Sequence, residues 1–221
     1  MMIKPQKYRI AFVFDTLYYP FTYPEILNSL AERKYKIIAA PSQGDPLLSG
    51  ARIYVSGFIA STKSGCFIQL NESSKLIACE GTSADNVVVT ARDIIDLSKE
   101  VFKLDIPNDI DYSELTASEI VSENGNPLET IKGFSGDGYD VFNEILENET
   151  SGYSIRIIPK TGIPTDRKWF DISITPRFST SEREYHIETV FRNAKDVESV
   201  LDFTSKLDEK IAAIITKIGG S

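Results

Sequence analysis

Histidine and cysteine are scarce in this chain, and their scarcity excludes several kinds of site. Among 221 residues there are one histidine, His186, and two cysteines, Cys66 and Cys79. A zinc site takes its ligands mainly from these two residue types, so the sequence predicts no metal site. A Ser-His-Asp or Cys-His arrangement would have to use His186, with Glu188 on the same face of a strand. A surface histidine with no catalytic task is the favoured interpretation.

A complete phosphate-binding loop is also missing. The segment Gly133-Phe-Ser-Gly-Asp-Gly138 precedes a predicted helix, and its backbone could hold an anion at the helix N-terminus. It lacks the Lys-Ser/Thr ending of a P-loop and does not clearly follow a strand. Asp137 or Gly138 as a simple helix start explains the segment as well. We therefore expect no cofactor and no enzymatic activity.

Long apolar runs are absent. No run approaches the roughly 18–20 residues that a membrane helix needs, and the first residues lead into Ile3-Lys-Pro5 without the apolar region of a signal peptide. The hydrophobic content of 42% is nevertheless enough for a folded core. We expect a soluble cytoplasmic protein without a membrane partner.

Positive charge is lacking in the second half of the chain. The sequence has 24 Lys and Arg and 32 Asp and Glu; residues 1–110 hold 12 of each, which leaves 12 and 20 for residues 111–221. Non-specific binding of duplex nucleic acid needs a basic surface that displaces counterions. The second half has the wrong sign for that role, and an acidic, solvated surface is the simpler interpretation.

The two cysteines bracket a predicted hairpin that turns at Asn71-Glu-Ser-Ser74. A two-residue loop at Glu72-Ser73 would place Cys66 directly opposite Cys79, whereas a register shifted by one residue would separate them. Two reduced, buried thiols are expected in a cytosolic protein, and a cross-strand disulfide is the alternative.

What the sequence does contain is a pattern that occurs twice. Residues 84–104 recur as residues 194–214, at a constant spacing of 110 residues. The matched pairs include Val87 with Val197, Ala91 with Leu201, Leu97 with Leu207 and Val101 with Ile211. Upstream, Tyr23, Ile26 and Leu30 match Tyr139, Phe142 and Leu146. Self-similarity of this kind indicates an internal duplication, with halves at residues 1–110 and 111–221 that form one compact unit.

Each half reads as a strand, a helix, several antiparallel strands and a long closing helix. In the first half we predict a strand at 8–15, a helix at 24–34, strands at 35–40 and 51–61, the cysteine hairpin, and a helix at 84–103. In the second half we predict a strand at 112–121, a loop at 122–138, a helix at 139–148, strands at 153–159, 168–175 and 184–191, and a closing helix whose apolar stripe runs from 197 to 218.

This order resembles the TATA-box-binding-protein-like fold, in which two such halves join in one curved antiparallel sheet with helices on one face. The resemblance implies an α+β fold of that architecture. It does not carry the TATA-box function, because the acidic second half differs from the basic DNA-binding members.

Residues that alternate with the apolar positions would line the open face of such a sheet. The candidate binding residues are Arg9, Arg52, Tyr54, Phe58, Phe67, Gln69, Arg156, Trp169 and His186. Exposed aromatics beside Arg and Gln suit a protein interface or base stacking, although Asp171 and Glu188 would repel phosphates. An ordinary sheet face partly covered by loops is the plain alternative.

Three hypotheses for function remain open. The first is a non-enzymatic module that binds a macromolecular partner through the open face. The second is binding of single-stranded or specific DNA through the Arg and aromatic residues of the first half. The third is a small-molecule pocket between the sheet and the C-terminal helix, which could belong to an enzyme. The sequence leaves the oligomeric state undetermined.

Overall fold

The strands of this protein form one open antiparallel sheet. The computed structural model describes residues 1–17, 19–22, 25–38, 57–106, 108–123, 125–177 and 183–220. In the first half these form β1 (Met2–Phe14), η1 (Pro20–Thr22), α1 (Glu25–Glu32), β2 (Lys36–Ile37), β3 (Gly57–Ser61), β4 (Phe67–Asn71), β5 (Leu76–Gly81) and α2 (Ala84–Glu100). In the second half they form β6 (Ile110–Ser122), α3 (Pro127–Ser135), η2 (Gly136–Phe142), α4 (Asn143–Leu146), β7 (Ile155–Ile157), β8 (Trp169–Arg177), β9 (Glu184–Asn193), α5 (Val197–Ser205) and α6 (Leu207–Gly219).

The two longest strands occupy the middle of the sheet. Its strand order is β2-β3-β4-β5-β1-β6-β9-β8-β7, and every neighbouring pair is antiparallel. Ile10 of β1 lies opposite Cys79 of β5 on one side and Leu115 of β6 on the other. Strands from both halves of the chain are therefore continuous in one sheet, and the expected α+β class is confirmed.

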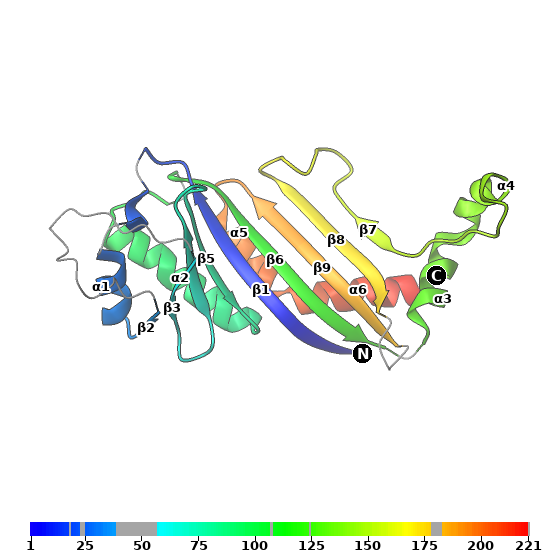
Figure 1. The fold of residues 1–221 in the computed structure, drawn as a ribbon, viewed down its shortest axis with the longest axis horizontal. Helices are drawn as coiled ribbons and strands as arrows, with labels where there is room; N and C mark the ends of the chain where they lie inside the picture. Colours follow the sequence, from blue (N-terminus) through cyan, green and yellow to red (C-terminus); the bar gives the residue numbers. More distant parts are fainter. Residues whose placement is uncertain are drawn as a thin grey trace.

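The main helices cover one face of this sheet and leave the other open (Figure 1). Helices α2, α5 and α6 lie behind the strands in this view, and the short segment from η2 to α4 projects from the far end. The alternation of β1 explains which face is covered, because Tyr8, Ile10 and Phe12 are buried whereas Arg9 is only half-buried. The buried set meets the apolar stripes of α2 and α5 in one hydrophobic core.

The closing helices bury most of the predicted positions. Of the matched residues, Val87, Ala91 and Leu97 of α2 are buried, as are Val197, Leu201, Leu207 and Ile211 of α5 and α6. The prediction that Val101 is buried is wrong. Helix α2 ends at Glu100, and Val101 is its C-cap and is 39% exposed. The backbone then turns at Lys103, where φ is +55°.

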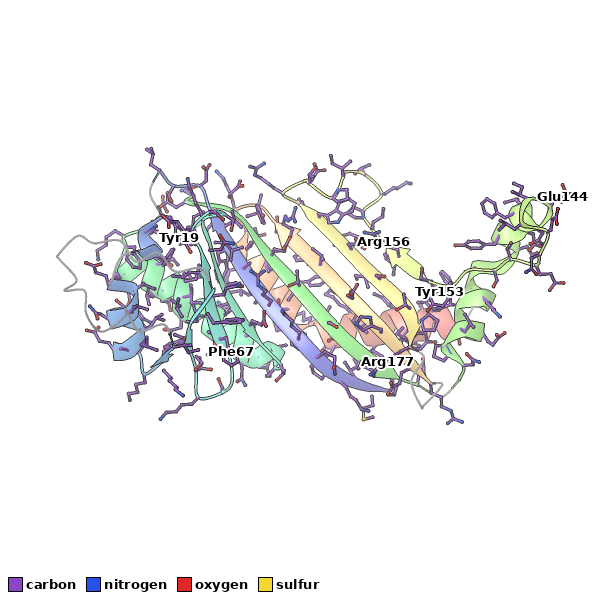
Figure 2. The ribbon with its side chains drawn as sticks, in the orientation of Figure 1. Tyr19, Phe67, Glu144, Tyr153, Arg156 and Arg177 are labelled. Carbon is purple, nitrogen blue, oxygen red and sulfur yellow. The ribbon has the colours of Figure 1, made fainter. Side chains whose placement is uncertain are left out.

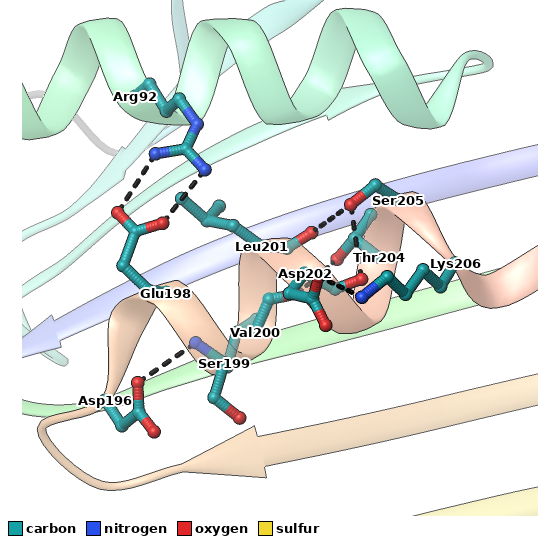
Figure 3. A network of polar contacts seen from close by, with 10 residues as sticks. All are labelled: Arg92, Asp196, Glu198, Ser199, Val200, Leu201, Asp202, Thr204, Ser205 and Lys206. Atoms are coloured by element: carbon teal, nitrogen blue, oxygen red, sulfur yellow. Dashed lines mark hydrogen bonds and ion pairs between the residues drawn. The ribbon is translucent and has the colours of Figure 1, made fainter.

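The C-terminal stripe is not one continuous helix. It breaks at Lys206, which ends α5 and precedes α6. The hydroxyls of Thr204 and Ser205 donate hydrogen bonds to the backbone carbonyls of Val200 and Leu201, respectively, four residues earlier in the helix (Figure 3). Such back-bonding bends helices, so these two residues account for the break. The same figure shows a bidentate ion pair between Arg92 of α2 and Glu198 of α5, which joins the two helices at the surface.

The prediction of a loop at residues 122–138 is wrong for most of these residues, because α3 and the start of η2 occupy residues 127–138. Asn126 is the N-cap of α3, where its side chain accepts hydrogen bonds from the amides of Leu128 and Glu129. Pro127 occupies the first turn, where its missing N–H is not needed. The Asn-Pro pair that indicated a loop is therefore a helix start. The helix predicted at 139–148 is instead the 3-10 segment η2 followed by one turn of α4.

The cysteine hairpin also has a different register from the predicted one. Asn71 pairs with Leu76, which makes a four-residue loop, and Cys79 lies opposite Ile68. Cys66 precedes β4, so the two cysteines are not cross-strand neighbours. Both thiols are free and buried. Burial is the main cause that raises the pKa of Cys79 above the ordinary value of a thiol.

Candidate functional site

The open face of the sheet is the candidate site, because strand register places most of the predicted residues on it. Cross-strand partners share a face. Phe58 pairs with Gln69 and Phe67 with Glu80, while Glu80 in turn pairs with Arg9. In the second half, Trp169 pairs with Arg192, Ser173 with Arg156, and Thr175 with His186. Arg52 and Tyr54 lie outside the described residues.

Two phenylalanines form an exposed cluster in the first half of the open face. Phe58 of β3 is 44% exposed and Phe67 of β4 is 41% exposed, and their ring centroids lie 5.5 Å apart. Next to them, Nη2 of Arg9 donates to Oε1 of Gln69 over 3.2 Å, across the intervening strand β5. Ala78 of β5, which lies opposite Gln69, has a small side chain that leaves room for this contact. We call Phe58, Phe67, Arg9 and Gln69 the aromatic patch (Figure 2 labels Phe67).

The arginines on the second half of this face are bound to carboxylates of the neighbouring strands. Nε of Arg156 lies 2.9 Å from Oδ1 of Asp171, and Nε of Arg192 lies 2.8 Å from Oε2 of Glu114. Arg177 pairs with Glu184 at 3.0 Å. Cross-strand pairs of opposite charge stabilise a sheet by a few tenths of a kcal/mol, up to about 1 kcal/mol. Their charges are neutralised locally.

Trp169 lies on the open face but is not accessible as expected, since it is only 5% exposed. The connection from β7 to β8 covers it. A Cβ atom added at Gly162 would lie 3.9 Å from the indole ring, and Arg192 donates to the backbone carbonyls of Pro164 and Asp166 in the same connection. A pocket of about 440 Å³ borders this place, between the connection and the ends of β8 and β9.

His186 is half-buried on the open face and contacts Ser118 of β6. Its Nε2 lies 3.0 Å from the Ser118 hydroxyl. Glu188 lies directly opposite Ser118 in the register, although no hydrogen bond between Glu188 and the imidazole is found among the described residues. Ser118 and His186 are within hydrogen-bond distance, as a nucleophile and a general base would be. A catalytic site also needs an acid that orients the histidine and donors for the oxyanion at the same place.

A pocket also lies between the sheet and the terminal helix, where the third hypothesis expects one. It measures about 340 Å³ and is lined by Glu123, Gly125, Thr130, Tyr185, Thr216, Gly219 and Gly220. Burial is the main cause that raises the pKa of Tyr185 there. The lining consists largely of polar residues and glycines, whereas ligand pockets are usually lined by apolar side chains around a few polar groups.

Within the described ranges, no group of three or more His, Cys, Asp or Glu side chains could hold a metal ion. No helix in the same ranges is long and apolar enough to cross a membrane. No protein-family model and no curated protein matches the chain.

The buried carboxyl group of Glu119 is not among the candidate site residues predicted from the sequence. Glu119 of β6 has no exposed surface, and its Oε1 accepts a hydrogen bond of 2.5 Å from the hydroxyl of Tyr8 on β1. The same hydroxyl lies 2.9 Å from Oδ1 of Asp208 in the first turn of α6. Neither Oε2 of Glu119 nor the Thr189 hydroxyl has a hydrogen-bond partner among the described residues. Desolvation is the main cause that raises the pKa of Glu119 to about 7.

Two residues in this network could have been found from the sequence. Tyr8 and Glu119 occupy positions that alternate with open-face residues, so each was predictable as inward-facing from the period of its strand. That they meet could not be predicted, because they are 111 residues apart in the chain.

Proposed function

We propose that this protein is a non-enzymatic binding module whose open sheet face binds a protein partner. The observation that supports this most is the aromatic patch. Phe58 and Phe67 keep two-fifths of their surface exposed on a face without covering helices. Large aromatic side chains beside an arginine are typical anchors of protein interfaces. The two rings are neighbours at 5.5 Å and so form a continuous apolar surface, a feature that marks interaction sites when it is exposed.

A protein partner is favoured over a nucleic acid because of the charges on this face. Arg156, Arg177 and Arg192 each pair with a carboxylate, so these cations are already neutralised before any phosphate arrives. Glu188 adds an exposed negative charge on the same face. The protein as a whole has a net charge of −8. Backbone phosphates need several free cations along their path, and this face offers few.

Site-specific photo-crosslinking in living cells would test the proposal. A photoreactive phenylalanine analogue replaces Phe67 on the open face, or Val89 in a matched control variant. Val89 is 66% exposed, but it lies on α2, behind the sheet. We expect a discrete covalent adduct from position 67 and none from position 89. Equal or absent adducts at both positions would argue against a binding role for the open face.

Binding to oligonucleotides separates a protein partner from a nucleic acid. We expect no binding of random single-stranded or duplex oligonucleotides, even at low salt. Binding whose affinity falls steeply with salt, and which is lost in Arg9→Ala, would replace the protein partner with a nucleic acid.

We also propose that the two halves arose by duplication and have the architecture of the TATA-box-binding-protein-like fold. The strand order supports this. The first strand of each half, β1 or β6, pairs with the last strand of its own half, β5 or β9, and the two first strands pair with each other. Superposition of residues 67–100 on residues 169–205 would test the relation, and a mismatch in strand direction would reject it.

A further inference from the structure

A second exposed apolar surface lies at the opposite end of the molecule from the first half. Residues 136–149, which we call the acidic protrusion, include η2 and α4 and project beyond the sheet (Figures 1 and 2). Neither element contains a buried residue. The exposed apolar side chains are Tyr139 (39%), Val141 (70%), Phe142 (45%), Ile145 (75%) and Leu146 (61%). Such a density of exposed apolar residues in a soluble protein marks an interaction site.

Polar contacts, rather than an apolar core, hold this protrusion in its conformation. The Thr150 hydroxyl donates to the carbonyl oxygen of Tyr139 over 2.6 Å, and the Thr150 amide donates to Oδ1 of Asn143 over 2.8 Å. Gly152 is buried, and a Cβ atom at this position would clash with the Ser135 hydroxyl, so the chain passes very close to the end of α3. The protrusion is thus a built feature of the fold that keeps its apolar side chains outward.

Helix α1, the segment of the first half that matches the protrusion in the sequence repeat, buries its large apolar side chains, whereas those of the protrusion are exposed. Ile26 and Leu30 of α1, which the sequence repeat matches to Phe142 and Leu146, are both 1% exposed in the core. Their counterparts on the protrusion are 45% and 61% exposed. Tyr23, the third member of the set, lies outside the described residues. The same apolar pattern is therefore buried in the first half, whereas in the second half no described segment of the chain buries it.

The charges on the two exposed surfaces are opposite. Residues 133–155 contain the acids Asp137, Asp140, Glu144, Glu147 and Glu149, and no Lys or Arg. The aromatic patch is bordered by cations instead. Lys36 of β2 lies opposite Ser61, the cross-strand neighbour of Phe67, and Arg9 is part of the patch itself.

Lys7 completes this border. It is 2.7 Å from Glu80, the other cross-strand neighbour of Phe67 and a carboxylate on the same face. Beyond the neutralised Lys7–Glu80 pair, Arg9 and Lys36 give the border of the aromatic patch a net positive charge. The apolar, acidic protrusion therefore fits that surface in both respects.

We propose that the acidic protrusion of one molecule packs on the aromatic patch of a second copy in an antiparallel, two-fold symmetric dimer. The aromatic patch lies on the first half of the sheet and the protrusion projects from the far end of the second half, so a chain cannot join its own pair (Figures 1 and 2). Two chains side by side in opposite directions make the contact twice, and the assembly closes. This inference rests on the proposed function, because it assigns part of the open face to a second copy.

The mass in solution tests the dimer directly. Light scattering after size exclusion is expected to give twice the chain mass of 24.7 kDa at high concentration, with dissociation on dilution and in salt. Ile145→Lys is expected to weaken the dimer at least tenfold, because it places a cation at the centre of the apolar contact. Val89→Lys makes the same change on α2 and is expected to leave the mass unchanged. Both positions are exposed, so both variants are expected to keep the melting temperature of the wild type at dilutions where the chain is monomeric.

A charge exchange identifies the two surfaces that meet. One variant carries Asp140→Lys, Glu144→Lys and Glu147→Lys, which changes the net charge of the protrusion from −5 to +1. A second variant carries Lys7→Glu and Lys36→Glu beside the aromatic patch. Each variant alone places like charges at both contacts and is expected to dimerise at least tenfold more weakly. Mixed together, they are expected to form a heterodimer, since both of its contacts again join opposite charges.

The possible outcomes separate this inference from the proposed function. A wild-type protein that remains monomeric at about 100 μM, a concentration at which micromolar dimers are populated, overturns the dimer. A dimer that Ile145→Lys leaves intact, or variants that do not form the heterodimer, also overturns it. The open-face proposal survives these results if position 67 still cross-links to a different protein. An adduct of twice the chain mass from position 67 supports both.

Discussion

The buried carboxyl of Glu119 makes the stability of this protein depend on pH in an unusual direction. The Tyr8 hydroxyl carries one hydrogen, so it can donate to Glu119 or to Asp208 but not to both. Asp208 lies in the first turn of α6, where the helix dipole favours a negative charge. We therefore expect Glu119 to hold the proton.

The size of the effect follows from the pKa. Burial raises the pKa of Glu119 from 4.5 to about 7, so the folded state binds this proton more tightly than the unfolded state. The stabilisation is fully present below pH 4.5, declines as pH rises, and is lost above pH 7. A shift of this size corresponds to about 3 kcal/mol at 1.36 kcal/mol per pKa unit.

Urea unfolding at several pH values measures this dependence. Glu119→Gln keeps the shape and the polar contacts but cannot ionise. We expect the wild type to lose about 3 kcal/mol relative to this variant between pH 4.5 and pH 8. Glu188→Gln on the exposed face is the matched control, and its curve should follow that of the wild type. If the stability of Glu119→Gln shows the same slope as the wild type, Glu119 is not the proton-binding group.

Three further predictions concern packing, capping and reactivity. Phe67→Ala is expected to cost less than about 1 kcal/mol of unfolding free energy, whereas Leu201→Ala in the core should cost about 2–5 kcal/mol, and chemical denaturation of both variants compares them. Similar losses in both would place Phe67 in the core. Asn126→Ala removes the cap of α3 and should cost about 1 kcal/mol in the same measurement. Cys79 should react with thiol reagents only under denaturing conditions, because it is buried and its pKa is raised; rapid labelling of the native protein would contradict this.

Local periodicity allowed much of the sheet to be predicted. Alternation in β1, β8 and β9 indicated which residues share a face, because a strand repeats every two residues whatever it pairs with. The stripe of the C-terminal helices was equally readable. The capping of α3 was also encoded locally, by Asn126 followed by Pro127, but the same two residues are common in turns.

The tertiary structure alone decided how accessible these faces are. Trp169 alternates correctly onto the open face, but the connection through Gly162 folds over it, and no periodicity in β8 encodes that cover. Leu146 matches the buried Leu30 in the sequence pattern yet remains exposed, because α3 rather than α4 contacts β8. The sequence by itself determined which side chains point to which side of each strand or helix, since that depends on backbone geometry. What covers each side, and which partner Glu119 meets, depends on segments far apart in the chain and was settled only by their packing.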